Sequence, residues 1–371
     1  MKPPIKSWTY LLLTVPVAIG AADWPSFRGD PQLSGAASGK LPKDLQVLWT
    51  FAAADAIEST AAIAAGAVYF GSLDGHLYAL DLETGALEWK YKASDEIKSS
   101  PLVADTTVYF GDELGDFHAV DVHTGKRRWL FQTEAGITSS ANLADDRLVF
   151  GSYDQNLYCL AARDGAPIWQ IATEGYIHSS PALFGDAVVV TGCDGYLRLV
   201  DLQTGAVRQS LELGTYMGAS AAISGHRAYV GTFGNEVLGI DLQKPQILWR
   251  YQNPQRQFSF YASAAVVPGA VVIGGRDKAV HALDPQSGEA LWTYAAGGRV
   301  DSSPLIVAGR VFFGTEAGAL VALDLQSGAE IWNFATGAAV TASPAVAAGR
   351  LIIGAADGIL YCFGREIKEH E

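Results

Sequence analysis

The residues best placed to carry chemistry are acidic ones, because a short pattern built on Asp returns along the chain. Asp-x-x-Thr/Ser-Gly begins at Asp81, Asp121, Asp201, Asp284 and Asp324. Carboxylates beside hydroxyls can bind Ca²⁺ or transfer protons. A catalytic carboxylate, however, has no reason to recur in copy after copy. Asp opens a turn by accepting a backbone N–H, and Gly supplies the positive φ that a tight hairpin requires. We therefore expect turns at these five sites.

Cysteine and histidine offer no better catalytic or metal site. Cys159, Cys193 and Cys362 are too few and too scattered for a disulfide framework or a metal site. The seven histidines include no pair at metal-ligand spacing. Gly-Ser-x-Asp-Gly recurs as a turn, so it is not expected to be a nucleophile elbow. The sequence predicts no catalytic residue, no metal and no cofactor.

A repeat that spans the chain must position all of these residues. A tryptophan stands eight residues after the Asp position of most copies, at Trp89, Trp129, Trp169, Trp249, Trp292 and Trp332, and Trp49 precedes them. The step is about 40 residues, and Gln209 takes the place of one tryptophan. Apolar runs such as 157–160 and 187–190 indicate strands that are covered on both faces. This period and these strands are typical of the blades of a propeller.

The predicted fold is all-β, an eight-bladed β-propeller of four-stranded antiparallel blades. The strands expected in the second copy are 99–103, 108–111, 117–121 and the stretch around Trp129. Counting either the third or the fourth strand of each copy gives eight blades. The chain begins with a fourth strand and ends after a third strand. Residues 46–51 should therefore complete the blade formed by 341–363 and close the ring.

The start of the chain has the layout of a secretory signal peptide. Lys2 and Lys6 precede an apolar run over 8–19, and small residues follow at 20–22. The run is too short to span a membrane, and no cysteine for a lipid anchor follows it. We expect removal of residues 1–22 and a periplasmic or secreted protein.

The rest of the chain divides into three segments by composition. Residues 23–45 are an irregular lead-in rich in Pro, Gly and Ser, 46–363 form the propeller, and 364–371 are a charged tail. Trp24 and Phe27 are expected to anchor the lead-in to the propeller surface. The formal charge of −13, from 26 basic and 39 acidic residues, opposes binding to nucleic acid or to anionic lipid.

The copy at 79–89, Ala-Leu-Asp-Leu-Glu-Thr-Gly-Ala-Leu-Glu-Trp, resembles the tryptophan-docking repeat of the pyrroloquinoline-quinone-like (PQQ-like) β-propellers. The resemblance covers about 47–363. That superfamily includes quinoprotein alcohol dehydrogenases, a lipoprotein scaffold of the outer-membrane β-barrel assembly machinery, and exported proteins of unassigned role. The Trp-Pro-Ser-Phe-Arg-Gly lead-in at 24–29 looks like the last group.

The dehydrogenases of this superfamily carry an adjacent-cysteine disulfide over the quinone, a stacked tryptophan and a calcium site with a catalytic Asp. None of these can be placed here, since no two cysteines are adjacent and every tryptophan inside the ring occupies a docking position. The resemblance thus implies a non-enzymatic exported member, related to the assembly scaffold lipoprotein, without a cofactor.

Positions that break the repeat are the candidates for recognition. Just before the small residue pair at the start of each first strand, the eight copies carry Glu58, Lys98, Thr138, His178, Gly218, Tyr261, Asp301 and Thr341. Because first strands line the axis of a propeller, these side chains predict a mixed-charge rim at the channel mouth, where a small polar ligand can bind. A solvated rim without a ligand is the alternative. Tyr216 and Arg299 vary in the same way nearby.

The one change of repeat length also predicts a contact surface. The crossover 252–261 has three extra residues and carries Arg256 and Phe258. Exposed aromatic residues beside arginine are typical of protein contacts, so this loop, with Phe233 and Arg276, is a predicted partner-binding patch.

The sequence therefore favours an exported non-catalytic scaffold or binding module whose partner is a protein. A PQQ-dependent dehydrogenase or another propeller enzyme is the alternative. A role in outer-membrane protein assembly is a third possibility, which the missing anchor cysteine argues against.

Overall fold

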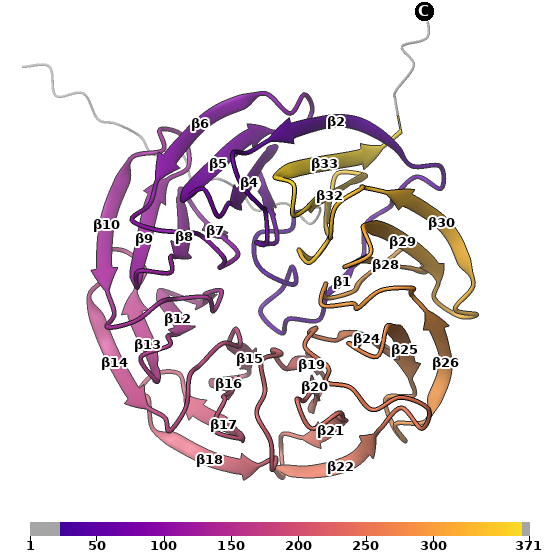
Figure 1. Cartoon of the computed structure of the whole chain (residues 1–371). Helices are drawn as coiled ribbons and strands as arrows, with labels where there is room; N and C mark the ends of the chain where they lie inside the picture. The colour runs from indigo at the N-terminus through magenta and orange to yellow at the C-terminus, as the bar shows by residue number, and fades with distance from the viewer. Residues whose placement is uncertain (1–22, 366–371) are drawn as a thin grey trace, which may run out of the picture.

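The computed structural model describes residues 23–365, which form a closed ring of eight β-sheets around a central channel (Figure 1). Every sheet contains a four-stranded antiparallel blade, and no helix occurs among the described residues. The all-β, eight-bladed prediction is confirmed. The predicted signal peptide at 1–22 and most of the tail, 366–371, lie outside the described residues.

In each blade the first strand lies nearest the channel and the fourth lies at the outer edge (Figure 1). Blades 1 to 4 are formed by β3 (Ala62–Ala64), β4 (Ala67–Gly71), β5 (His76–Asp81), β6 (Leu87–Lys92); β7 (Leu102–Ala104), β8 (Thr107–Gly111), β9 (Asp116–Asp121), β10 (Arg127–Gln132); β11 (Asn142–Ala144), β12 (Arg147–Gly151), β13 (Asn156–Ala161), β14 (Pro167–Ala172); and β15 (Ala182–Phe184), β16 (Ala187–Thr191), β17 (Tyr196–Asp201), β18 (Val207–Glu212).

Blades 5 to 8 repeat the pattern. They are formed by β19 (Ala222–Ser224), β20 (Arg227–Gly231), β21 (Val237–Asp241), β22 (Gln246–Tyr251); β23 (Ala265–Val267), β24 (Ala270–Gly274), β25 (Ala279–Leu283), β26 (Ala290–Ala295); β27 (Leu305–Val307), β28 (Arg310–Thr315), β29 (Ala319–Asp324), β30 (Glu330–Ala335); and β31 (Ala345–Ala347), β32 (Arg350–Gly354), β33 (Ile359–Gly364) with β2 (Gln46–Ala52). β1 (Ala36–Ala37) is a short addition to blade 7.

Blade 8 joins the two ends of the chain. β2 pairs antiparallel with β33, with Val47 opposite Phe363 and Ala52 opposite Ile359. In Figure 1 the indigo strand β2 and the yellow strand β33 lie side by side. The ring is therefore closed as the sequence predicts, and no open sheet edge is left between the ends.

First strands are shorter than expected. The predicted strand 99–103 begins only at Leu102, because the two serines before it bond elsewhere. The Ser99 hydroxyl bonds both the N–H and the C=O of Gly111, and the Ser100 N–H donates to the Ser140 hydroxyl of the next blade. These polar contacts replace the ladder over the first part of the predicted strand.

Each tryptophan of a fourth strand docks on the following blade. The Trp89 indole N–H donates to the Val122 carbonyl at 2.8 Å. The same ring covers Gly125, where a Cβ would lie 2.8 Å from the indole. Gly125 also has φ 64°, so glycine serves both the turn and the docked ring. Trp49, Trp129, Trp169, Trp249 and Trp292 repeat this arrangement.

The interface between blades 4 and 5 lacks this device on both sides. Gln209 replaces the tryptophan on β18 and is exposed. The turn that should receive the indole reads Lys244-Pro245, where the other copies have Thr, Ser or Asp followed by Gly. The indole ring and the glycine that makes room for it are thus both absent at this interface. This is expected if the two pack as one unit.

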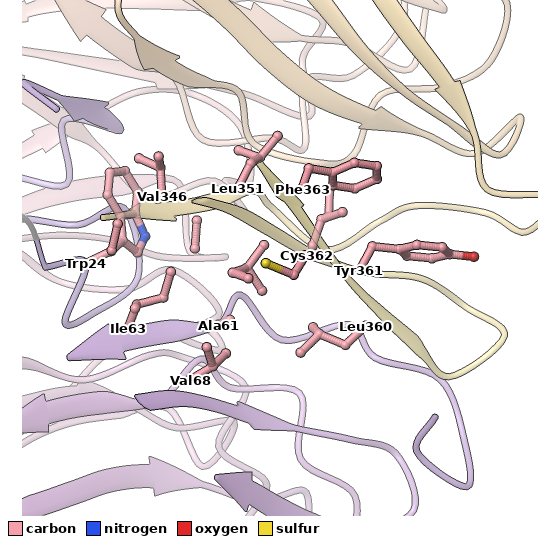
Figure 2. Close-up of a cluster of buried hydrophobic side chains, with 14 of the residues drawn as sticks. Trp24, Ala61, Ile63, Val68, Val346, Leu351, Leu360, Tyr361, Cys362 and Phe363 are labelled. Carbon is pink, nitrogen blue, oxygen red and sulfur yellow. The ribbon is translucent and has the colours of Figure 1, made fainter. Parts of the chain in front are cut away.

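The lead-in crosses the middle of the ring and closes one end of the channel (Figure 1). Six first strands donate their central N–H to backbone carbonyls of this segment at 2.7–2.9 Å; the donors are Ile63, Val103, Leu183, Ile223, Val266 and Ile306. Trp24 is 2% exposed and lies beside Ile63 and Val346 in the apolar cluster that also contains Cys362 (Figure 2). The lead-in is therefore an internal plug, not a surface attachment.

Arg28 is the charged centre of this plug. Its side chain is fully buried, and its guanidinium donates to the carbonyls of Ala264, Ser303 and Pro304 in blades 6 and 7. Burial lowers the pKa of Arg28 to about 9, against the opposing effect of Asp30. The three carbonyls hold the cation where no water reaches it.

Candidate functional site

The other end of the channel opens as a polar cavity of about 480 Å³. Its lining comes from the crossovers between blades, from the loops between second and third strands, and from Phe27 of the lead-in. We call the side of the ring formed by these loops and crossovers the mouth face. All eight rim positions predicted from the repeat line the cavity: Glu58, Lys98, Thr138, His178, Gly218, Tyr261, Asp301 and Thr341. The structure thus places all eight rim residues at the channel mouth, as expected from the sequence.

A ring of hydroxyls lies next to these residues along the first strands. The N–H of Thr60 donates to the Ser100 hydroxyl, and the same bond is repeated from blade to blade up to Ser303 and Ser343, at 2.8–3.0 Å. Because each hydroxyl oxygen acts as an acceptor in this ring, the bond does not require the hydroxyl's own proton. The ring ties the blades together and gives the cavity wall a regular polar surface.

One side of the cavity carries a cluster of charges. Lys98 Nζ lies 3.2 Å from Glu113 Oε2 and 3.5 Å from Glu96 Oε2, and the Thr138 hydroxyl donates to Glu113 Oε1 at 2.8 Å. Partial burial lowers the pKa of Lys98, but the carboxylates of Glu113, Glu96 and Glu58 together more than offset this, so the net shift is upward. Partial burial raises the pKa of Glu58, against the opposing effect of Lys98. Lys98 is therefore held as a cation.

A Tyr–His–Tyr group forms another part of the wall. The Tyr153 hydroxyl lies 2.6 Å from His178 Nδ1, and the Tyr261 hydroxyl lies 2.5 Å from His178 Nε2. Burial lowers the pKa of His178 to about 4, so the imidazole is neutral at pH 7. A neutral ring donates from one nitrogen and accepts at the other. One tyrosine must therefore accept from His178, and it keeps its own O–H to offer to a ligand.

Arg276 and Asp301 form a paired group beside Tyr261. The Arg276 Nη2 and Nε atoms lie 2.8 and 3.0 Å from the two Asp301 oxygens, a bidentate geometry. The guanidinium also lies 4.7 Å from the centre of the Tyr261 ring and 6.0 Å from that of Phe233. The hydrogen bond to Asp301 raises the pKa of Arg276. Arg276 is thus fixed in place.

The charges in the cavity do not cancel. The carboxylates of Glu58, Glu113 and Asp301 face the cations of Lys98 and Arg276, which leaves one negative charge while His178 is neutral. Nothing in the lining pairs a nucleophile with a free base, since both His178 nitrogens are bonded to tyrosines. The arrangement is suited to binding a polar or cationic group.

Six of the ten predicted site residues come together in this cavity: Glu58, Lys98, His178, Tyr261, Arg276 and Asp301. Tyr216, Arg256, Phe258 and Arg299 are exposed outside it. Glu113, Tyr153 and Phe27 also line the cavity, although they were not predicted from the sequence. Glu113 and Tyr153 occupy the same loop position as Arg276, so aligning these loops across the copies would identify them as lining residues. Whether the ten residues bind anything stays a prediction.

A group of aromatic side chains extends from the cavity onto the mouth face. Among the described residues the exposed aromatics are Tyr176, Tyr216, Phe233 and Phe258, with 54%, 64%, 38% and 46% exposure. We call these four residues the aromatic face. Three belong to successive crossovers from blade 3 to blade 6, and Phe233 lies in the loop between β20 and β21. The Phe233 N–H donates to the Tyr216 carbonyl, and Tyr176 stacks on Tyr153 of the cavity.

The closed ring with docked tryptophans defines a PQQ-like β-propeller. The sequence model of a family described as outer membrane protein assembly factor BamB matches residues 42–143, 119–277 and 246–366, which together span most of the chain. The chain therefore belongs to this family. No curated protein sequence matches it.

Solved structures share the fold at low sequence identity. BamB from Moraxella catarrhalis has a TM-score of 0.74 at 20% identity, covering 87% of this chain and 100% of that one. A quinohemoprotein alcohol dehydrogenase from Comamonas testosteroni has a TM-score of 0.81 at 14% identity, covering 94% of this chain and 82% of that one. A europium-containing methanol dehydrogenase has a TM-score of 0.81 at 12% identity, covering 93% and 98%. BamB and these dehydrogenases thus share this architecture.

The residues present do not fit the quinone site of such dehydrogenases. No tryptophan lines the cavity, because the seven tryptophans of the blades all donate from their indole N–H to backbone carbonyls outside it. Cys159 and Cys362 are buried in two separate apolar clusters, so they do not form the adjacent-cysteine pair that the dehydrogenases carry. Of the cavity carboxylates, Glu113 and Asp301 are paired with cations.

Within residues 23–365 no helix is long and apolar enough to cross a membrane.

Proposed function

We propose that this chain is an exported, non-catalytic propeller that binds a partner protein through the aromatic face, with the polar cavity receiving a side chain of that partner. The observation that carries the proposal is the gathering of all the exposed aromatics of the described residues in one sector of the mouth face. Aromatic residues near arginine supply much of the energy of protein contacts. Phe258 lies on the only crossover that is longer than the others, with Arg256 5.6 Å from its ring centre.

The other exposed apolar side chains are distributed differently. Of the nine large aliphatic side chains that are exposed among the described residues, Leu114 lies in the loop between β8 and β9. The other eight lie on outer strands, one on each blade: Val47, Leu87, Leu130, Ile168, Val207, Leu248, Leu291 and Ile331. One exposed aliphatic residue on every outer strand follows from the repeat itself. Such residues do not cluster in any sector of the ring. The aromatic face is confined to one sector, so the repeat does not account for it, and a contact surface does.

The cavity adds selectivity to this surface. Its surplus negative charge and its hydroxyls favour a basic or polar side chain over an acidic one. The second candidate is a small polar ligand bound in the cavity without a partner protein. It is favoured because all eight blades contribute polar groups to the cavity lining. The family description supports a component of outer-membrane protein assembly as the first partner to test. Export rests on the signal peptide predicted at 1–22.

A photo-crosslinking experiment tests the proposed surface. A photoreactive amino acid at position 258 should give a discrete crosslinked species in an envelope fraction, and unlabelled wild-type protein should compete it away. The same amino acid at Leu291, which is 51% exposed on the outer edge, is the matched control and should give no such species. Tyr216→Ser combined with Phe233→Ser should reduce the yield at position 258 at least tenfold, because both rings leave the contact.

Equal crosslinking at positions 258 and 291 would count against the aromatic face. The enzyme alternative has its own test, in which purified protein is given the quinone and Ca²⁺. Alcohol-dependent dye reduction under these conditions would overturn the non-catalytic proposal, whatever the crosslinking result.

A further inference from the structure

Three buried side chains that could hold a metal ion come together in blade 2. Asp112 lies in the loop before β9, and Asp116 and His118 lie on β9, with 0%, 5% and 1% exposure. One ligand atom from each lies within 4.8 Å of the other two. Asp112 Oδ2 and His118 Nε2 are 3.0 Å apart. The group lies below the mouth face, next to Glu113 of the cavity.

One carboxylate oxygen of this group has no partner. Asp116 Oδ2 accepts from the Ser94 hydroxyl at 2.6 Å, but Asp116 Oδ1 is buried without any hydrogen bond. A buried, unpaired carboxylate oxygen beside a second carboxylate is unfavourable unless a cation compensates it. The unpaired oxygen thus points to a positive ligand.

The other blades show that this second carboxylate is not needed for the fold. Blades 1, 3, 4 and 6 each place a single Asp in this loop, four residues before a polar partner on the third strand: Asp74 and Tyr78, Asp154 and Tyr158, Asp194 and Arg198, Asp277 and His281. Blade 2 has Leu114 at that Asp position, 53% exposed. It brings two carboxylates to its histidine from positions that in blade 6 are Gly275 and Ala279.

Blade 6 is therefore an internal comparison. His281 Nε2 lies 2.9 Å from Asp277 Oδ2 and its Nδ1 lies 3.0 Å from the Tyr251 hydroxyl, as His118 Nδ1 lies 3.1 Å from Tyr91. Its one carboxylate is completed by the Asn253 amide at 2.6 Å. Blade 6 is satisfied by neutral donors, whereas blade 2 has an extra negative charge in the same surroundings.

We propose that Asp112, Asp116 and His118 form a binding site for a divalent transition-metal ion of the Zn²⁺ type. One imidazole and two carboxylates are ligands that Zn²⁺ accepts, at about 2.0–2.2 Å. In such a site the ion replaces the proton between His118 Nε2 and Asp112. The Nδ1–H tautomer then donates to the Tyr91 oxygen, which is the outer partner that metal-bound histidines require. Ser94, exposed above Asp116, provides the route from solvent and an oxygen near the ion.

A bound ion would act on the cavity as well. It would join the loop that carries Glu113 to β9, and Glu113 holds Lys98 and Thr138. This inference does not depend on the proposed protein partner, since it concerns only the interior of blade 2.

Zn²⁺ titration of the tag-free, chelator-treated protein tests the site. Calorimetry should find one Zn²⁺ per chain, and the thermal midpoint should rise with Zn²⁺. Asp116→Asn should weaken this binding at least tenfold and abolish the rise. Asp154→Asn, in the single-carboxylate loop of blade 3, is the matched control and should bind as wild type does.

Folding and ligation are checked separately. Without metal, Asp116→Asn should be no less stable than wild type, because it removes a buried like charge. X-ray absorption of the wild-type zinc complex should show one nitrogen and two or more oxygen ligands. Absence of binding to wild type at micromolar Zn²⁺, or wild-type binding by Asp116→Asn, would overturn the proposal, and so would sulfur ligation by a cysteine.

Discussion

The two ends of the central channel are built in opposite ways. At the closed end, one segment of chain meets six first strands through the same backbone hydrogen bond, and Arg28 binds carbonyl groups. At the open end, one repeat position carries seven residue types in eight blades. Of these residues, His178 bonds to Tyr261, and Lys98, Thr138 and Asp301 bond to side chains of neighbouring loops. Apart from Arg28, the closed end is held by backbone hydrogen bonds, which do not depend on residue type. The open end depends on residue identity, so it is the end that can recognise a ligand.

Removing the buried guanidinium should have the largest effect and should break the closed end. Arg28→Ala leaves three carbonyls without their donor and creates a cavity, so we expect a loss of about 3–5 kcal/mol in the free energy of unfolding. Urea unfolding measures this loss. Arg299→Ala, an exposed arginine of the mouth face, should cost less than about 0.5 kcal/mol. Similar costs for the two arginines would mean that the plug contributes little to stability.

Lowering the pH should destabilise the open end, with a smaller effect than the loss of Arg28 at the closed end. His178 has a folded pKa of about 4, below the ordinary value of 6.5, because burial disfavours the cation. The unfolded chain then binds more protons between these values, so stability is present in full above pH 6.5 and falls as the pH drops toward 4. The loss approaches about 3 kcal/mol at the lower limit.

His178→Gln should remove this part of the pH dependence, as measured by urea unfolding at pH 7.0 and 4.5. The matched control, His123→Gln, replaces an exposed histidine and should keep the wild-type slope. A wild-type slope in His178→Gln would show that His178 is not held neutral by burial.

The smallest expected effect sharpens the comparison within the open end. Tyr261→Phe removes the hydroxyl bonded to His178 Nε2 and keeps the ring under Arg276, so the cost should be about 1 kcal/mol. Tyr216→Phe, which is 64% exposed, should cost nothing measurable in the same denaturation experiment. A cost above about 3 kcal/mol for Tyr261→Phe would make the Tyr–His–Tyr group a structural core rather than a surface that can open to a ligand.

The repeat made most of the fold predictable. The spacing of Trp89 and its equivalents gives the number of blades, and the unpaired Trp49 strand gives the closure of the ring by β2 and β33. The rim residues could be placed because one repeat position faces the axis in every blade. The plug could not be predicted, since its bonds come from backbone carbonyls, which leave no pattern in residue type.

The site was predictable only where one position varies against a constant background. Glu58 and His178 were found in this way, whereas Phe27 lies outside the repeat and reaches the cavity only because the lead-in crosses the channel. The blade 2 group was missed because Asp112 and Asp116 stand where blade 6 has a Gly and an Ala, and no second His or Cys lies beside them to mark a metal site. The sequence has no paired His or Cys at ligand spacing, so it predicts no metal there.

Closure of the ring by β2 and β33 imposes an order on folding. β2 and the lead-in are made first, yet their partners are β33 and the first strands of blades as late as blade 7. Contacts between such distant parts of the sequence form slowly, because a long loop must close before they are gained. The emerging chain thus has β2 without a partner until β33 of blade 8 appears. The export proposed above, which rests on the signal peptide predicted at 1–22, would be helped by a fold that cannot be completed early.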